Sequence, residues 1–297
     1  FSDGLRKILL SSASGKSLIS KIKPWLRMKL NYLKPKLPGV KEPRTGLSMG
    51  ESTEIIAKKY DISRSSQDQL AFKSHLNAAS AYENGFYDDL IEPYKDIHQD
   101  NLIRKNPSLD KLGSLKTVFD KSNSGTMTPG NSTSLTDGAA AVILSSEEWA
   151  RSNDLNIKAF LSHIEIAAID YINDEGLLMA PAYAVSNMLK KANLSLQDFD
   201  FYEIHEAFAA QTLATLKVWE SDEFCRSKLN RESAMGSIDS AKINVKGGSL
   251  AIGHPFAATG ARIVGTMAKL LNEKGSGRGL ISICTAGGMG ITAIMEK

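Results

Sequence analysis

Cysteine is scarce in this sequence, and long apolar runs are missing from it. The 297 residues include two cysteines, Cys225 and Cys284, which are too few for a disulfide framework and fit a reducing compartment. The sequence has no run of about 18 apolar residues, so it predicts no membrane-spanning helix. The stretch from Phe1 to Lys7 has no signal-peptide layout and no initiator methionine, and we expect further coding sequence upstream of it.

The balance of residue types is that of a folded globular protein. Hydrophobic residues make up 42% and charged residues 23%, which excludes a disordered or fibrous chain. A length of 297 residues predicts one large domain or two of ordinary size. No short-period repeat or low-complexity tract suggests a repeat architecture.

Positive charge is concentrated between residues 16 and 44, which hold nine Lys or Arg residues against one acid, Glu42. The prolines of this segment favour short helical pieces over one long helix. Its interleaved Trp, Tyr, Leu and Met side chains are typical of segments that lie on a membrane surface or bind an anionic ligand. A solvated surface hairpin explains the charge equally well. Nucleic-acid binding is less favoured, because no base-reading motif accompanies the charge.

From residue 157 onward the pattern alternates between strand and helix. We expect strands over 158–165, 199–204, 279–284 and 290–296, and helices over 182–192, 207–219 and 257–274. Such alternation predicts an α/β layered domain.

The first half of the chain is less regular. We expect one helix over 51–60 and a second from a capping box at Ser65 to about Asn84, with Gly85 just beyond its end. The apolar run 139–144 predicts a short buried strand.

Three short motifs follow predicted strands, where α/β folds place reactive groups. His205 stands between the strand 199–204 and a helix. His254 lies in the glycine-rich loop from Gly247 to Pro255, whose backbone N–H groups can approach a ligand closely. Cys284 ends a strand just before a glycine turn.

Each motif also has a purely structural explanation. His205 would then be a capping or core histidine, the loop around His254 a structural turn, and Cys284 an inert apolar residue. As a reactive group, the histidine of the glycine loop suits acid–base catalysis or oxyanion binding. The thiol suits proton transfer beside an imidazole.

Taken together, these motifs resemble those of the thiolase family. The loop from Gly247 to Pro255, followed by Ala258 to Arg262, is similar to the family's glycine-His-Pro motif. The segment from Cys284 to Gly290 is similar to its C-terminal cysteine-glycine motif. The segment from His205 to Ala209 is similar to a third motif that begins with Asn in many members. This His variant and the basic segment 16–44 most resemble the long-chain β-oxidation thiolases, including the β subunit of the trifunctional complex.

The resemblance covers essentially the whole chain and implies the α/β thiolase fold, layered αβαβα and here incomplete. Residues 1–133 would form the loop domain, with a basic excursion at 16–44. Residues 134–153 would be a remnant of the N-terminal half, and residues 154–297 would form the C-terminal half.

The activity implied by the resemblance is acyl transfer: cleavage of 3-ketoacyl-CoA by CoA into acetyl-CoA and a shortened acyl-CoA. His254 would activate the nucleophilic thiol and hydrogen-bond the thioester oxygen. His205 would hold the oxyanion or its water. Cys284 would protonate the departing enolate and then deprotonate CoA. Backbone N–H groups at Ala286 and Gly287 would complete the oxyanion site.

The same resemblance assigns Met49, Thr133 and Ser249 to the binding of the acyl-CoA and CoA. It implies no metal and no redox cofactor, since CoA is itself a substrate.

In thiolases the nucleophilic cysteine lies in roughly the first third of the family member's own chain. That third precedes a segment like Phe1 to Asp3 of this sequence. Cys225 lies in a polar stretch that does not resemble its surroundings. We therefore expect a fragment of an acetyl-CoA C-acyltransferase that is inactive by itself. Its central helices and one sheet face would lack apolar cover.

Three other functions remain open. The first is a non-catalytic, acyl-CoA-binding or structural thiolase-like subunit. The second is a ketoacyl synthase, which the Cys284 motif disfavours. The third is a membrane-surface module built on residues 16–44. By resemblance the protein would be a homodimer or dimer of dimers, would have a hydratase–dehydrogenase subunit as a candidate partner, and would reside in the bacterial cytoplasm or in mitochondria.

Overall fold

The computed structural model describes residues 2–35, 39–173 and 175–297. The chain divides into two compact units, Phe1–Lys41 and Glu42–Lys297. Each unit is described by itself below. No helix in the described ranges is long and apolar enough to cross a membrane.

The first unit is a set of short helices with a very small core. Its elements are α1 (Asp3–Ala13), α2 (Leu18–Ile22), η1 (Lys23–Arg27) and η2 (Leu30–Leu33). Pro24 stands in the first turn of η1, where its missing N–H costs nothing, so the short pieces expected from the prolines are confirmed. Leu5 and Ile8 are the apolar side chains that this unit buries among its described residues.

The second unit is built on one four-stranded mixed sheet. Its strands are β1 (Phe160–Ala168), β2 (Phe201–Ile204), β3 (Arg278–Thr285) and β4 (Met289–Glu296), in the order β1-β4-β3-β2. β2 and β3 are parallel, whereas β4 is antiparallel to both β1 and β3. All four strands were predicted, and their ends differ from the prediction by at most three residues. Because β2 and β3 run in the same direction, their carboxyl ends meet at one edge of the sheet.

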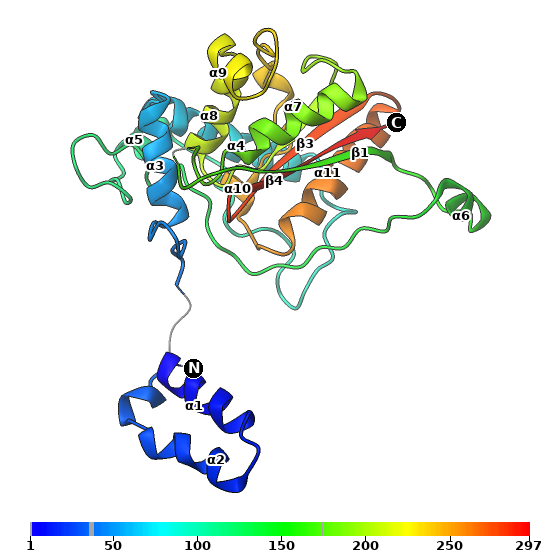
Figure 1. Cartoon of the computed structure of the whole chain (residues 1–297). Helices are drawn as coiled ribbons and strands as arrows, with labels where there is room; N and C mark the ends of the chain where they lie inside the picture. The colour runs from blue at the N-terminus through cyan, green and yellow to red at the C-terminus, as the bar shows by residue number, and fades with distance from the viewer. Residues whose placement is uncertain (1, 36–38, 174) are drawn as a thin grey trace. The chain divides into compact units, whose positions relative to one another are not determined.

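Helices cover both faces of this sheet (Figure 1). On one face, α7 (Ala180–Ala192) packs on β1, β3 and β4, with α8 (Ala209–Trp219) beside it. On the other face, α11 (Thr259–Lys274) packs on β2, β3 and β4. The predicted α/β layering is therefore confirmed. α11 ends at Gly275, whose φ of +81° suits a glycine at a helix end.

Two further helices pack against α8. α3 (Met49–Lys59) packs on α8, and α4 (Arg64–Glu83) packs on α8, on α5 (Leu109–Gly113) and on α10 (Ser249–Ile252). Both helices were predicted, but the capping box at Ser65 was wrong. Ser63 is the N-cap, and its hydroxyl accepts the N–H of Ser66. The remaining short elements are α6 (Glu147–Ser152), α9 (Asp222–Ser227) and η3 (Ser240–Lys242).

The predicted buried strand over 139–144 is wrong. This segment has no strand pairing, and its large side chains, including Ile143 and Leu144, are exposed. An apolar run becomes a strand only when another strand lies beside it, and here none does.

The α11 face of the sheet is left open at the β1 end. Ile164 pairs with Ala293 of the core under α11, so its side chain lies on that face, followed by Ile166. Both are more than half exposed, and Met289 and Ile291 on β4 are also exposed. An uncovered sheet face was expected, and the structure confirms it.

Candidate active site

Two imidazoles meet at the carboxyl edge of the parallel strands. His205 follows the last residue of β2, and its backbone N–H continues the pairing by donating to Ser282 O at 2.8 Å. His254 lies between α10 and α11, and its N–H donates to Ser134 O at 2.9 Å. The two ring centroids are 4.3 Å apart at an interplanar angle of 49°. The sequence prediction that these two side chains converge is confirmed.

His205 is fully buried, with one ring nitrogen bonded and the other unpartnered. Its Nδ1 lies 2.8 Å from Ser249 Oγ, while its Nε2 has no hydrogen-bond partner among the described residues. Burial lowers the pKa of His205 well below its usual value, and the nearby His254 and Arg262 lower it further. The ring is therefore neutral at pH 7, and its Nε2 is buried without a hydrogen bond to any residue that the structure describes.

His254 is half-buried, and its Nδ1 lies 2.7 Å from Thr259 Oγ1. That hydroxyl donates its own proton to Pro255 O at 3.1 Å. Thr259 therefore accepts a hydrogen bond from Nδ1–H, which leaves the lone pair of His254 on Nε2. Burial and the charge of Arg262 lower the pKa of His254. A neutral imidazole with a free Nε2 lone pair is the form required of a general base.

Cys284 lies at the same edge, near the end of β3. Its thiol donates to Gln211 Oε1 at 3.6 Å, and it packs with Leu178, Ala207 and Met49. Burial raises the pKa of the thiol to about 12, so Cys284 is a neutral thiol at pH 7. That form donates a proton readily to a strong carbon base and is not a nucleophile.

Glu206 holds the glycine loop in place behind the imidazoles. Its carboxylate accepts from Asn244 Nδ2 at 2.6 Å, from Ser74 Oγ at 2.7 Å and from Leu250 N at 3.2 Å. A Cβ on Gly248 would overlap this carboxylate, so the close packing needs glycine there. The glycines therefore bring the loop onto β2, which fixes where His254 can lie.

The predicted oxyanion residues and two predicted ligand-binding residues lie around this cluster. Ala286 and Gly287 are exposed in the turn between β3 and β4. Met49 begins α3 and packs in the Cys284 cluster. Thr133 is partly buried, and its hydroxyl donates to Ser249 O at 2.6 Å. Their roles toward the acyl-CoA stay predictions.

Ser249 is fully buried, and its hydroxyl faces the interior. Its Oγ lies 2.8 Å from His205 Nδ1 and accepts from an Nη of Arg262 at 2.9 Å. The predicted contact of Ser249 with CoA stays a prediction.

Sequence reasoning gave no role to several residues that shape the site. Thr259 binds the His254 ring directly, and Arg262 binds Ser249, the partner of His205. Gln211 binds the Cys284 thiol. Thr259 and Arg262 stand in the segment that follows the glycine-His-Pro motif, so their position was a usable signal. Nothing in the local pattern of α8 marks Gln211.

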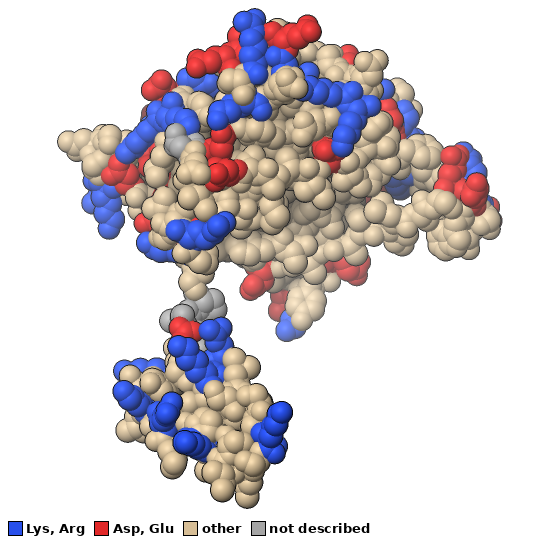
Figure 2. Space-filling model, viewed as in Figure 1, with Lys and Arg blue, Asp and Glu red and all other residues tan. Residues whose placement is uncertain are grey.

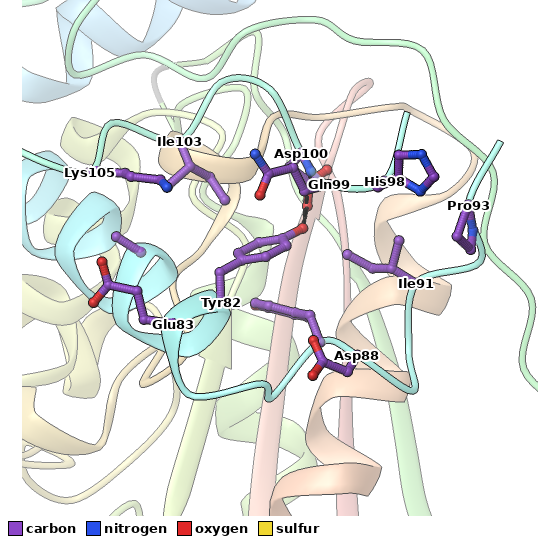
Figure 3. A pocket seen from close by; sticks show the side chains of 12 residues that line it. Tyr82, Glu83, Asp88, Ile91, Pro93, His98, Gln99, Asp100, Ile103 and Lys105 are labelled. Carbon is purple, nitrogen blue, oxygen red and sulfur yellow. Dashed lines mark hydrogen bonds between the residues drawn. The ribbon is translucent and has the colours of Figure 1, made fainter. Parts of the chain in front are cut away.

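A separate cavity of about 420 Å³ lies between α4 and the connector that follows it (Figure 3). The Tyr82 hydroxyl donates to Asp100 at 2.6 Å across its floor. None of His205, His254 and Cys284 lines it. The cavity is therefore distinct from the cluster of two imidazoles and a thiol. Its lining is Ala79, Tyr82, Glu83, Tyr87, Asp88, Ile91, Pro93, His98, Gln99, Asp100, Ile103 and Lys105.

Both thiols are expected to resist alkylation in the folded chain. Cys225 is buried with its Sγ against the carbonyl oxygens of Val218 and Trp219, and Cys284 is buried with a raised pKa. Because only the thiolate reacts, Cys284 should be alkylated at least about 100-fold more slowly than glutathione. Intact-mass spectra after iodoacetamide treatment should show no adduct in buffer and two adducts in denaturant. Rapid single labelling of the folded chain would contradict this prediction.

The fold and the site together define an α/β protein with two imidazoles and a buried thiol at the carboxyl ends of its parallel strands. Residues 155–297 match the family described as thiolase, C-terminal domain, and residues 12–148 match thiolase, N-terminal domain. The chain belongs to the thiolase family.

Relatives and solved structures agree with this membership. The chain is 44% identical over 301 residues to proteins named 3-ketoacyl-CoA thiolase from Yersinia pestis (strain Pestoides F) and Yersinia pseudotuberculosis serotype O:1b. Each match covers 99% of this chain and 68% of the relative. Bacillus anthracis acetyl-CoA acetyltransferase superposes with a TM-score of 0.75 at 32% identity, over 91% of this chain and 67% of that one. Human mitochondrial 3-ketoacyl-CoA thiolase in complex with CoA gives 0.73 at 30% identity, over 89% and 65%.

Proposed function

We propose that this chain supplies the acid–base and oxyanion groups for cleavage of 3-ketoacyl-CoA by CoA, the thiolase reaction of fatty-acid β-oxidation. The observation that carries the proposal is the His205–His254 contact, in which both imidazoles are neutral and have Nε2 free. A protonated thiol, Cys284, lies at the same sheet edge. The names of the relatives support the same reaction.

The high pKa of Cys284 suits both of its proton transfers. Cleavage of the carbon–carbon bond releases an acetyl-CoA enolate, and the neutral thiol gives its proton to that carbon. The thiolate left behind has a conjugate acid with a pKa of about 12, well above the value near 8.5 of an ordinary thiol. It therefore takes the proton from the incoming CoA thiol, which regenerates Cys284 and makes CoA a nucleophile.

The imidazoles divide the remaining work. His254, with a lone pair on Nε2, takes the proton of the attacking thiol and can return it to an oxygen as a hydrogen-bond donor. His205 faces the same space with an unpartnered Nε2 and contributes to oxyanion binding. Neither Cys225 nor Cys284 is placed as the attacking thiolate, because both are buried and Cys284 stays protonated.

Exchange of the α-protons of acetyl-CoA with deuterium from D₂O tests the proposal. Exchange needs a base at the α-carbon and donors at the thioester oxygen, and it does not need a covalent intermediate. We expect the full chain to catalyse exchange well above the rate in buffer, measured by mass spectrometry of acetyl-CoA. Exchange at the buffer rate would overturn the proposal. A thiolysis assay with acetoacetyl-CoA and CoA then reports whether these 297 residues complete the whole reaction.

The first unit supports a second function, attachment to an anionic membrane surface. Residues 1–41 hold ten Lys or Arg residues against one acid, Asp3, and Figure 2 shows basic side chains over this unit. Many of its large apolar side chains are exposed: Leu10, Leu18, Ile19, Ile22, Trp25, Leu26, Leu30 and Leu33. Exposed apolar and basic side chains on short helices fit the boundary between lipid headgroups and acyl chains. Homodimers or dimers of dimers and a hydratase–dehydrogenase partner stay predictions of the family resemblance.

Changing both Leu26 and Leu30 to Asp is expected to weaken binding to anionic vesicles at least tenfold. Both leucines are more than 80% exposed, and each contributes apolar area to a lipid contact that a carboxylate would oppose. Co-sedimentation with phosphatidylcholine vesicles, with and without phosphatidylglycerol, measures the effect. The matched control is Leu109→Asp, an exposed leucine of the second unit, which should bind as the unchanged chain does. Equal binding by all three proteins would rule out a membrane contact through this unit.

A further inference from the structure

A buried line of three side chains runs from α11 to the catalytic imidazoles. Arg262 on α11 donates from an Nη to Ser249 Oγ at 2.9 Å, and Ser249 Oγ lies 2.8 Å from His205 Nδ1. Ser249 and His205 are both fully buried, so water does not compete for these contacts. The line ends at His205 Nε2, which is buried and has no partner in the part of the chain that the structure describes.

The direction of each hydrogen bond follows from the donors available. A guanidinium can only donate, so Ser249 Oγ must accept from Arg262. The hydroxyl proton of Ser249 is then free to donate, and His205 Nδ1 is the acceptor within reach. A ring nitrogen that accepts carries no proton, which places the single proton of the neutral ring on Nε2. We propose that Arg262 and Ser249 are positioning residues that fix His205 in its Nε2–H tautomer.

This arrangement gives the two neighbouring imidazoles opposite tautomers. Thr259 leaves His254 with its proton on Nδ1 and its lone pair on Nε2, whereas Ser249 leaves His205 with its proton on Nε2. The pair thus carries one acceptor and one donor Nε2 on rings whose centroids are 4.3 Å apart. The acceptor Nε2 of His254 can take a proton from a thiol, and the Nε2–H of His205 can donate a hydrogen bond to a developing oxyanion. Neither ring has to gain or lose a proton before the reaction.

The role of His205 toward an acyl oxygen rests on the proposed function. The Nε2–H tautomer of His205 does not depend on that function. Arg262 also faces a buried carboxyl, Glu203, and its charge disfavours a proton on either imidazole. These effects keep both rings neutral. Only a neutral imidazole carries a single N–H proton, so only a neutral ring has distinct tautomers.

The tautomer can be measured directly in the full chain labelled with ¹⁵N-histidine. Two-bond ¹H–¹⁵N correlation spectra at pH 7.5 distinguish protonated from unprotonated ring nitrogens. His75 should show an unprotonated Nδ1 and a protonated Nε2, because its Nδ1 accepts the N–H of Arg104 at 3.2 Å. We expect a second set of resonances of this kind, from His205, that disappears in His205→Asn. In Ser249→Ala that Nδ1 loses its donor, and its resonance should move toward the protonated range. Ser249→Thr, which keeps the hydroxyl, should retain the original pattern.

Matched variants distinguish a specific effect on the His205 tautomer from a general effect on the fold. Arg262→Met should shift the His205 pattern as Ser249→Ala does, and Arg262→Lys should shift it less. Thr259→Ala should change the pattern of His254 and leave that of His205 unchanged. A protonated Nδ1 on His205 in the unchanged chain overturns the proposal, even if no variant folds. An unaltered His205 pattern in folded Ser249→Ala, judged by circular dichroism, overturns it as well. If the spectra of the unchanged chain are as expected but it does not catalyse acetyl-CoA exchange, the result counts against the proposed function and not against the tautomer.

Discussion

Glu203→Gln is expected to stabilise the protein by about 4 kcal/mol at pH 9 and to leave its stability nearly unchanged at pH 4. Glu203 lies on β2 and is fully buried, and one of its oxygens has no hydrogen-bond partner within the described ranges. Burial is the largest effect and raises the pKa of Glu203 to about 8. The charge of Arg262 lowers this pKa, and the nearby Glu206 raises it. Each unit of such a shift corresponds to about 1.4 kcal/mol.

The sign follows from proton uptake on folding. The folded pKa is above the unfolded value, so protonation of Glu203 favours the folded state fully below about pH 4.5. That contribution is lost progressively as the pH rises to about 8, where the folded chain must bury a carboxylate. A glutamine does not ionise, so the gap in unfolding free energy between variant and unchanged chain should widen over this interval and then level off.

Urea unfolding at pH 4, 6, 8 and 9 measures this gap. The comparison between pH values matters more than any single value, because the new amide changes local hydrogen bonding equally at each pH. Glu220→Gln, at an exposed glutamate, controls for the loss of one negative charge. A gap that stays constant from pH 4 to pH 9 would mean that Glu203 is not held protonated by burial.

The sequence predicts the sheet well because its strands carry strong local signals. β2 and β3 are rich in apolar residues and reach His205 and Cys284 at their carboxyl ends, and α11 ends at a glycine that adopts a positive φ. Such features depend on a few neighbouring residues, so they can be recognised without knowledge of the fold.

The errors lie where structure depends on distant partners. Residues 139–144 have the composition of a buried strand, yet pairing requires a second strand that no local pattern can guarantee. At the start of α4, Ser63 and Ser65 compete as caps, and the difference is one hydrogen bond to the N–H of Ser66. Local propensity does not decide between two serines that are two residues apart.

The same distinction applies to the site. His205, His254 and Cys284 each stand in a motif, and the two imidazoles meet as predicted. Ser249 and Arg262 act through contacts with other segments, so their partners appear only once α10, α11 and β2 are packed together. A serine in a glycine loop predicts a ligand contact from sequence, and only burial shows that it faces the protein interior.

Cys284→Ala is expected to reduce acetyl-CoA α-proton exchange at least about 1,000-fold, to the rate in buffer. The base for exchange is the Cys284 thiolate, and alanine leaves no group that can take the α-proton. Loss of a positioned acid–base group costs about 100- to 10,000-fold. Because the pKa of Cys284 is about 12, its thiolate fraction grows tenfold per pH unit. The enzyme-catalysed rate should therefore rise about tenfold per unit between pH 7 and pH 10, after subtraction of the Cys284→Ala rate.

Cys225→Ala is the matched control, because it removes the other buried thiol. Cys225 lies on α9, packed between the ends of α8 and α9 and away from both imidazoles. Its loss should leave exchange within about threefold of the unchanged chain, since it creates a small cavity and removes no reacting group. Equal losses in the two variants would show that thiol removal acts through packing. A pH-independent rate in the unchanged chain would show that the proton is taken by a group of much lower pKa, such as His254, and Cys284 would lose its place in the reaction.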